Sequence, residues 1–427
     1  MQPSARGLRR DRYAGTEAQH RRHRPDYGLL ILMLILLTIG VVVIYAIGPA
    51  LALANNVSSN FYSSRQLIAI ALALVAFFVT SRVPIGDWRR WHKPLLVFAA
   101  LATLVALVTP GNPQYPAHRW IRLGSFSFQS VELLKFAVLV WLAGLLADRI
   151  KNNLITDTRS TLKPFLIVVV IVGLVVAGVQ SDFGSAVVML AMMGALAFVG
   201  GMPLKRLVLV GGILLIGGVL AISVVPYRRE RLMTFLHPTA DCQTTGYQAC
   251  QALISVGSGG LIGLGLGRSV QAYGYLPEAS NDSIFAIYAE KFGFIGVAIL
   301  LALFAALFGR LKNIAARAPN DFSRLFVMGV LVWLSVQSII NIGAMIGLLP
   351  LKGITLPFIS YGGTSVVFVM AAMGVVFQIS RYTSYVNETN DDNGRRTAHE
   401  GPFDRRRIRR AYYPDPGGRT RTKAIAA

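Results

Sequence analysis

The chain of 427 residues carries 42 Lys and Arg against 20 Asp and Glu, a net charge of +22, yet only 15% of its residues are charged and 54% are hydrophobic. This composition excludes an ordinary soluble enzyme, which could not cover so much apolar surface, and it also argues against a disordered chain. Two Cys and 6 His leave no room for a disulfide-stapled scaffold, a four-thiolate zinc site or a His-rich metal centre.

Apolar runs long enough to cross a membrane recur between Tyr27 and Arg381. The sequence predicts an all-α polytopic membrane protein with about ten transmembrane helices, because a backbone exposed to lipid must satisfy its own hydrogen bonds. In chain order, the predicted spans are roughly 28–48, 66–82, 94–110, 133–147, 164–180, 184–202, 207–226, 284–308, 325–349 and 363–380. A single membrane domain, 28–381, therefore lies between two polar tails, 1–27 and 382–427.

The basic residues indicate the orientation of these spans. Residues 1–27 carry 7 Arg against three acidic residues, and residues 381–427 carry 11 basic against 6 acidic residues. An even number of spans puts both tails on one side, and the loops predicted on that side are basic too. By the positive-inside rule this side is cytoplasmic, so the excess of positive charge reflects topology and contact with lipid headgroups rather than nucleic-acid binding. The tails have the composition of disordered segments.

Two loops on the opposite, outer side are long and rich in polar groups, about 111–132 and 227–283, the second lying between the seventh and eighth spans. Loops of this length in a compact protein are usually functional. Within the second loop, the glycine-rich stretch 257–267 before Arg268 fits either a turn packed on the membrane or a backbone that approaches a phosphate. Cys242 and Cys250 fit either a disulfide or two free thiols.

Ionisable residues inside or beside apolar spans are a sharper signal, because each is costly in hydrocarbon unless it is paired or hydrated. Here they are Glu132, Lys135, Asp182, Glu290, Lys291 and Lys352. Glu132 and Lys135 share a helix face and are expected to pair. Glu290 and Lys291 point in different directions and need other partners, for which Asp182 is a candidate. These features predict a polar outer cavity, which a transporter, an enzyme acting on a lipid-borne substrate or an assembly scaffold could each use.

Several ordered motifs resemble those of the SEDS family of bacterial cell-wall polymerases, over about residues 28 to 381. They lie at 119–135, 180–184, 251–267, 273–290 and 341–363, the last containing Leu349–Pro350–Leu351–Lys352–Gly353 and Leu356–Pro357–Phe358–Ile359–Ser360–Tyr361–Gly362–Gly363. The run Tyr273–Gly274–Tyr275 and the Lys352–Gly353 pair are more similar to the cell-division branch of the family than to its elongation branch. The chain departs from the family pattern at Ser280–Asn281, just before Asp282, and at Lys291.

The resemblance implies a glycosyltransferase that polymerises lipid II, a disaccharide-pentapeptide on polyprenyl diphosphate, into glycan strands at the outer face of the cytoplasmic membrane. Asp282 is the implied catalytic carboxylate; a helix-capping Asp is the alternative that its position before an apolar run allows. The implied substrate contacts are Arg119, Trp120, Arg268 and Lys352, and the implied cavity-shaping residues are Glu132, Lys135, Asp182 and Glu290. No metal-ligating cluster is visible, although a divalent cation (Mg²⁺ or Mn²⁺) at the diphosphate is compatible with the chemistry.

The family resemblance also implies partners and a location. These are a class B penicillin-binding transpeptidase, other division proteins and membrane lipids, at the division septum. Three other functions stay open: a lipid II flippase, which would need polar groups through the depth of the membrane; an elongation polymerase; and a division scaffold, for which the tails would matter and Asp282 would not.

Overall fold

The structure, a computed structural model, describes residues 20–22, 24–109, 120–123, 126–224, 233, 235, 242–244 and 246–384. These residues belong to one compact unit, Gln19–Ser384. Arg119, the two tails up to residue 19 and from residue 385, and most of 225–245 lie outside the described residues, so the predictions made for them stay predictions.

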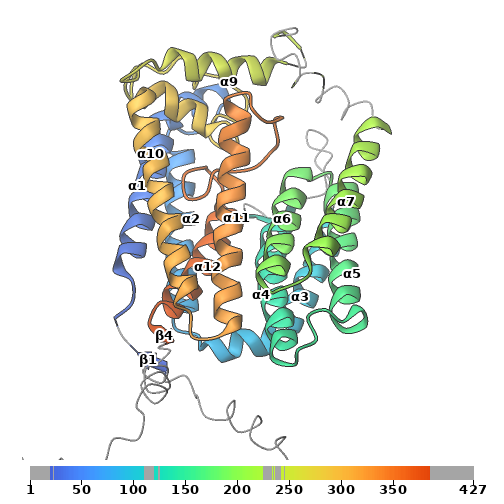
Figure 1. The fold of residues 1–427 in the computed structure, drawn as a ribbon. Coiled ribbons are helices and arrows are strands. Elements are labelled where there is room, and N and C mark those ends of the chain that lie inside the picture. The colour runs from blue at the N-terminus through green and yellow to red at the C-terminus, as the bar shows by residue number, and fades with distance from the viewer. Residues whose placement is uncertain are drawn as a thin grey trace, which may run out of the picture. The chain divides into compact units, whose positions relative to one another are not determined.

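Helices dominate the described chain, and a helix coincides with each of the predicted apolar runs (Figure 1). In chain order they are α1 Tyr27–Ala54, α2 Phe61–Thr80, α3 Ile85–Val108, α4 Ser130–Lys151, α5 Lys163–Ile171, α6 Phe183–Val199, α7 Leu204–Val224, α9 Tyr247–Ser258, α10 Ile284–Ala316, α11 Asp321–Met345 and α12 Gly363–Ile379. Two π-helical segments, η1 Thr158–Leu162 and η2 Val172–Val179, extend α5 on both sides.

Seven helical segments of the described residues are long and apolar enough to cross a membrane, and α6 and α12 are shorter apolar helices. The expectation of an all-α, multi-pass membrane protein is therefore confirmed, whereas the count of ten crossings stays a prediction. Helix α4 lies at the centre, since 94% of its most apolar window is buried inside the protein. It packs against α3, α6, α11 and α12. A helix that is apolar on all sides is expected to be enclosed in this way.

The two flanks of the membrane region meet at one end of the helices. Strand β1, His20–Arg22, pairs antiparallel with β4, Tyr382–Ser384. Nearby, the backbone N–H of Asp26 donates to Ser380 Oγ at 3.0 Å. Helix α9 lies across the other end, which we call the α9 end (Figure 1). Both flanks therefore lie on the same side, as an even number of spans requires, and the charge pattern predicts that side to be cytoplasmic.

The two predicted outer loops are more ordered than their sequences indicated. Residues 120–129 form a hairpin of β2, Trp120–Leu123, and β3, Phe126–Gln129, which leads directly into α4. The second loop contains helix α9. The sequence did not predict this helix, because an amphipathic stretch of only 12 residues gives a weak periodic signal. Helix α3 begins at Ile85 rather than near 94, because its polar first turns continue the helix, with Trp88 packed edge-on against Phe136 of α4.

Candidate active site

Asp282 lies in the turn 278–283 that precedes α10 at the α9 end. Glu278 adopts a positive φ of 51°, and its carbonyl accepts hydrogen bonds from the backbone N–H groups of Asn281 at 2.9 Å and Ser283 at 3.1 Å. Ser283 occupies the N-cap position of α10, so Asp282 stands one residue before the cap. Asp282 itself is half-buried.

Neighbouring elements hold this turn through its backbone carbonyls. The three hydrogen bonds run from the Tyr361 N–H to Ser280 O (2.8 Å), from Ser360 Oγ to Asn281 O (2.7 Å) and from Asn341 Nδ2 to Asp282 O (2.8 Å). Two of the donors belong to the segment 350–362 between α11 and α12, and the third lies on α11. Because consecutive carbonyls are all bonded, the backbone position of Asp282 is fixed by contacts that do not use its carboxylate.

The segment 350–362 has no regular secondary structure and is nevertheless buried deep among the helices. Ile354, Leu356 and Ile359 are at most 3% exposed, and Phe358 adopts a positive φ of 67°. A residue other than Gly rarely takes this conformation, and it persists only where the surroundings enforce it. A side chain at Gly40 of α1 would collide with the backbone of Phe358 and Ile359. Close packing on α1 therefore enforces the path of this segment.

Lys352 comes from the start of the same segment and lies beside α6. Its Nζ is 5.3 Å from the centroid of the Phe183 ring, a cation–π distance. Asp182 caps α6, with Oδ1 accepting from the Ser185 N–H at 3.1 Å. The expectation that Asp182 partners Glu290 or Lys291 is wrong, because its carboxylate faces the N-terminus of its own helix. One segment thus carries Lys352 to α6 and holds the turn that carries Asp282.

Tyr361, at the end of this segment, interacts with Arg65 of α2, a cation that the sequence analysis did not single out. Burial raises the pKa of the Tyr361 phenol, partly offset by a hydrogen bond from Arg65 of α2 and by its charge. The phenol therefore stays protonated at physiological pH. The Arg65 guanidinium lies over the Phe61 ring at 4.2 Å, and its side chain is exposed at the α9 end.

Glu132 and Lys135 form the expected ion pair, with Lys135 Nζ 2.7 Å from Glu132 Oε1 and both side chains buried. Lys135 Nζ also lies 3.4 Å from Gln337 Oε1 of α11, and Trp333 Nε1 donates to the same oxygen at 2.8 Å. Gln337 Nε2 in turn donates to the Thr355 carbonyl at 2.9 Å. The ion pair is therefore connected to the segment 350–362 through Gln337, which contacts both Lys135 and Thr355.

Glu290 and Lys291 of α10 hold the loop that follows α9. Glu290 accepts hydrogen bonds from Ser269 Oγ at 2.5 Å and from the backbone N–H groups of Val270 and Gln271, at 2.9 and 3.3 Å. Lys291 Nζ donates to the Leu266 carbonyl at 2.6 Å. Arg268 lies between these two anchoring points. It is exposed and forms no ion pair with any described residue.

The glycine-rich stretch packs on a break in α10. Gly293 has a φ of 63°, and this non-helical residue interrupts the backbone hydrogen bonds within α10. The stretch replaces them: the N–H groups of Phe294 and Ile295 donate to Gly260 O (2.9 Å) and Leu261 O (3.0 Å), and those of Leu264 and Gly265 donate to Glu290 O (2.9 Å) and Lys291 O (3.0 Å). The structure thus shows a turn packed on α10, while contact of this stretch with the membrane or with a phosphate stays a prediction. The glycines permit contact between two backbones.

We expect Gly263→Ala to destabilise the protein by at least about 2 kcal/mol, because Gly263 has a φ of 82° and a Cβ there would collide with the Lys291 carbonyl. Gly267→Ala is the matched control, since nothing lies within 4 Å of a Cβ at that position. Thermal unfolding of the two purified variants in one detergent checks the difference. Equal midpoints would contradict this explanation of the glycines.

The β2–β3 hairpin carries Trp120, whose side chain is exposed. Its second strand is fixed to the start of α12, where Thr364 Oγ1 bridges the Ser127 carbonyl and the Gln129 N–H, both at 3.3 Å. Trp120 thus stands on an element anchored next to the segment 350–362. Arg119, the residue before it, lies outside the described residues.

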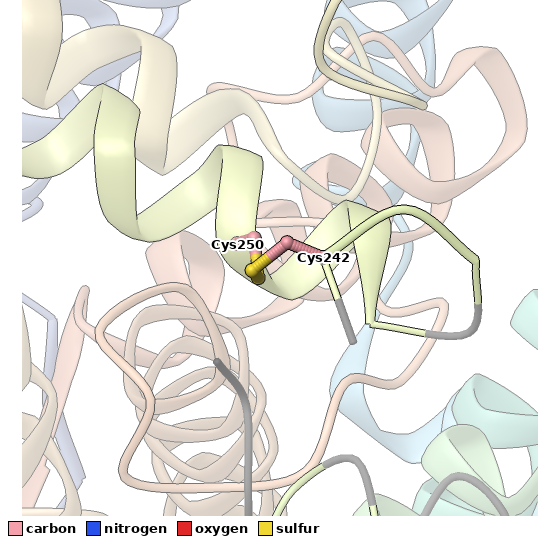
Figure 2. The surroundings of a disulfide bond; sticks show 2 residues. All are labelled: Cys242 and Cys250. Atoms are coloured by element: carbon pink, nitrogen blue, oxygen red, sulfur yellow. A yellow bond between two sulfur atoms is a disulfide. The ribbon is translucent and has the colours of Figure 1, made fainter. Parts of the chain in front are cut away.

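Helix α9 lies on the turn that carries Asp282. Gln248 Nε2 donates to Ser283 Oγ at 3.2 Å, and Ser255 Oγ donates to the Ala286 carbonyl at 3.0 Å. A disulfide joins Cys250, in the first turn of α9, to Cys242 in the preceding turn (Figure 2). The sequence left the state of the two thiols open, and the structure contains the disulfide.

Reduction of this disulfide is expected to destabilise the α9 region by about 2–3 kcal/mol, since the bond closes a short loop with a sequence separation of 8. We expect dithiothreitol to lower the unfolding midpoint of the wild-type protein and to leave that of Cys242→Ser unchanged. A drop of equal size in both proteins would show that the reductant acts elsewhere.

Among the residues that the structure describes, no group of three or more His, Cys, Asp and Glu side chains could hold a metal ion. The described chain thus offers no ready-made set of ligands for a divalent cation. A cation held mainly by the diphosphate of a substrate stays a prediction, and no chemical step below is assigned to it.

Sequence reasoning gave no role to the polar residues of α11 that connect the site, although Asn341 begins the last family motif, 341–363. Gln337 and Asn341 lie four residues apart in the C-terminal half of α11, and both are at most 1% exposed. A polar stripe of this spacing in a membrane span is itself a signal of buried partners. Their partners lie in other segments, so the sequence pattern could mark these residues but could not assign their role.

Comparison with known proteins identifies the family to which the chain belongs. The family of FtsW, RodA and SpoVE, described as "Cell cycle protein", matches residues 27–385. This chain belongs to that family. Stage V sporulation protein E of Bacillus subtilis is 37% identical over 362 residues, which are 84% of this chain and 98% of that protein. The probable peptidoglycan glycosyltransferase FtsW of Coxiella burnetii is 39% identical over 366 residues, which are 84% of this chain and 96% of that protein.

Solved structures of family members have the same fold. A chain from a structure described as "Structural coordination of polymerization and crosslinking by a peptidoglycan synthase complex" superimposes with a TM-score of 0.70 at 28% identity, covering 84% of this chain and 98% of that chain. RodA of Thermus thermophilus superimposes with a TM-score of 0.59 at 27% identity, covering 84% of this chain and 97% of that chain. The expected family and polytopic helical fold are thus confirmed.

Proposed function

We propose that this protein is a peptidoglycan glycosyltransferase that polymerises lipid II into glycan strands, with Asp282 as its catalytic carboxylate. The observation that carries the proposal is the position of Asp282, on a turn that Asn341, Ser360 and Tyr361 hold against the segment bearing Lys352. Membership of the FtsW, RodA and SpoVE family supports the same activity, since several relatives are named as probable peptidoglycan glycosyltransferases.

The reaction joins the 4-hydroxyl of one disaccharide to C1 of another and releases polyprenyl diphosphate. Asp282 acts as general base: it takes the hydroxyl proton as the oxygen forms its bond to C1 and the bond from C1 to the diphosphate oxygen breaks. A positioned carboxylate typically accelerates such a proton transfer by about 10²–10⁴-fold. Asp282 is half-buried in the turn before α10, and we expect a headgroup sugar to reach it at the α9 end.

The leaving diphosphate requires positive charge. Lys352 and Arg268 are the described candidates, and Arg119 is a third candidate outside the described residues. Arg268 suits a bidentate phosphate contact because Glu290 and Lys291 fix the loop around it while the guanidinium stays exposed. Exposed Trp120 supplies a flat apolar surface for a sugar ring. Glu132, Lys135, Asp182 and Glu290 shape the cavity through the contacts described above.

The distribution of buried charge favours polymerisation over transport. The buried Asp, Glu and Lys side chains of the described residues are Glu132, Lys135, Asp182, Glu290 and Lys291. Asp182 is the N-cap residue of α6, and the other four lie within about two turns of the N-termini of α4 and α10, at the α9 end. A flippase would need polar groups through the depth of the membrane to carry a charged headgroup across it.

We assign the enzyme to septal wall synthesis in cell division, with elongation as the alternative. Relatives named FtsW are 33–39% identical to this chain, and the Thermus thermophilus RodA is 27% identical. The structural neighbour from a synthase complex supports a partner that cross-links the product; a class B penicillin-binding transpeptidase has this activity. The enzyme then works with other division proteins at the septum, in the cytoplasmic membrane, with both tails in the cytoplasm.

Synthesis of glycan chains from lipid II tests the function. The full-length protein, purified with its cognate transpeptidase, is incubated with lipid II in detergent, with and without Mg²⁺ or Mn²⁺, and the products are separated by length. We expect polymers that lysozyme digests. An intact complex that makes no polymer, while vesicles containing it translocate lipid II, would establish the flippase instead.

A further inference from the structure

Asn341 is a polar residue without an assigned role at the end of an apolar helix. It lies in the last turns of α11 and is 1% exposed. An amide at this depth is costly unless it is hydrogen-bonded, so an apolar residue would serve packing better. Its presence calls for a polar function.

The amide nitrogen of Asn341 connects two segments that carry candidate catalytic residues. Nδ2 donates to the carbonyl of Asp282 at 2.8 Å and to the carbonyl of Ile354 at 2.6 Å. An amide NH₂ group has two hydrogens, so one group satisfies both acceptors. Ile354 follows Lys352 by two residues. The two acceptors lie 59 and 13 residues away from Asn341 in the sequence.

Neither acceptor belongs to a regular helix or strand. Their positions therefore depend on side-chain donors rather than on a backbone ladder. Ser360 Oγ, which donates to Asn281 O, and Gln337 Nε2, which donates to Thr355 O, bind the neighbouring carbonyls of the same two segments. Ser360 Oγ also accepts from the Leu356 N–H of its own segment at 2.7 Å. Asn341 differs in standing on a third element, α11, from which its two amide hydrogens reach one carbonyl of each segment.

We propose that Asn341 is a positioning residue that sets the place of Asp282 relative to Lys352, and so aligns the base with the cation that receives the leaving diphosphate. The inference rests on the polymerase function proposed above. Small displacements of a catalytic group are expensive in rate, about 10²-fold for about 1 Å. Loss of the two N–H donors should therefore lower kcat more than it changes the KM for lipid II.

The test compares Asn341→Ala and Asn341→Ser with wild type, Asp282→Asn and Ser338→Ala, each purified with the transpeptidase and assayed per folded protein. Ser338 is the matched control, because it is buried one turn away on α11 and its Oγ donates within the helix, to Leu334 O at 2.8 Å. We expect Asn341→Ala to lower kcat by about 10–100-fold with KM changed by less than about threefold. Asn341→Ser, which keeps one donor, should fall between, and Ser338→Ala should match wild type.

The pH profile of kcat separates positioning from general support of the fold. If Asn341 acts through Asp282, the limb of the profile that Asp282→Asn removes should shift in the Asn341 variants and not in Ser338→Ala. Wild-type kcat and profile in both Asn341 variants, or failure of both to fold, would overturn the inference. If the wild-type complex makes no polymer, the proposed function itself is refuted. If wild type makes polymer and Asp282→Asn does not, the function stands, and the Asn341 variants alone decide whether Asn341 is a positioning residue.

Discussion

Asp282→Asn is expected to lower the rate of glycan polymerisation by about 10²–10⁴-fold, the range associated with loss of a general base. The variant should fold and insert normally, because the carbonyls of Ser280, Asn281 and Asp282 keep the hydrogen bonds that hold the turn. The amide is close in size to the carboxylate and cannot accept the proton. Initial rates from fluorescent lipid II, with the transpeptidase bound, measure the effect.

Glu278→Gln is the control for charge in the same turn. Glu278 is exposed, and its carboxylate accepts a hydrogen bond from Asn281 Nδ2 at 2.6 Å. The substitution removes the same charge four residues away and should change the rate by less than about threefold, since an exposed carboxylate contributes little. If Glu278→Gln and Asp282→Asn were equally slow, the charge of the turn would matter and Asp282 would lose its specific role.

Lys135→Met should lower the free energy of unfolding by about 3–5 kcal/mol, because it leaves the buried Glu132 carboxylate without its cation. The double variant Glu132→Gln/Lys135→Met should recover most of this loss, since a buried pair replaced by neutral groups is often nearly neutral in stability. Equilibrium unfolding in mixed micelles, in a double-mutant cycle, gives the coupling energy.

Arg324→Met provides the comparison for an exposed pair of the same spacing. Arg324 lies 3.2 Å from Asp321, also three residues apart on a helix, but both side chains are exposed. Its loss should lower the free energy of unfolding by at most about 1 kcal/mol. Similar values for Lys135→Met and Arg324→Met would mean that water reaches the Glu132–Lys135 pair.

Much of the site was within reach of the sequence because its signals are local. Lys352, Glu132 and Lys135 stood out as ionisable groups beside apolar runs. Asp282 was indicated only by the motifs that resemble a known family. The ion pair of Glu132 and Lys135 followed from their spacing on one helix face. The chemistry of these side chains is visible in the order of residues alone.

The partners of Asp182, Glu290 and Lys291 were not predictable in this way. Glu290 and Lys291 bind a loop 20–25 residues earlier in the chain, and Asp182 caps its own helix. The sequence offers several carboxylates and cations near the same predicted depth, and only the fold decides which of them meet. Lys135 and Gln337, 202 residues apart, are a contact of the same kind.

By itself, the sequence determined the class of protein, the apolar runs, the shared side of the two flanks and the family. These depend on hydropathy, length and charge along the chain, which local physics fixes. Only the tertiary structure decided that the glycine-rich stretch completes the hydrogen bonds of a broken α10, that α9 lies over the turn of Asp282, and that Asn341 joins two distant segments. Each of these depends on buried backbone groups finding partners far away in the chain, which folding settles and residue order does not.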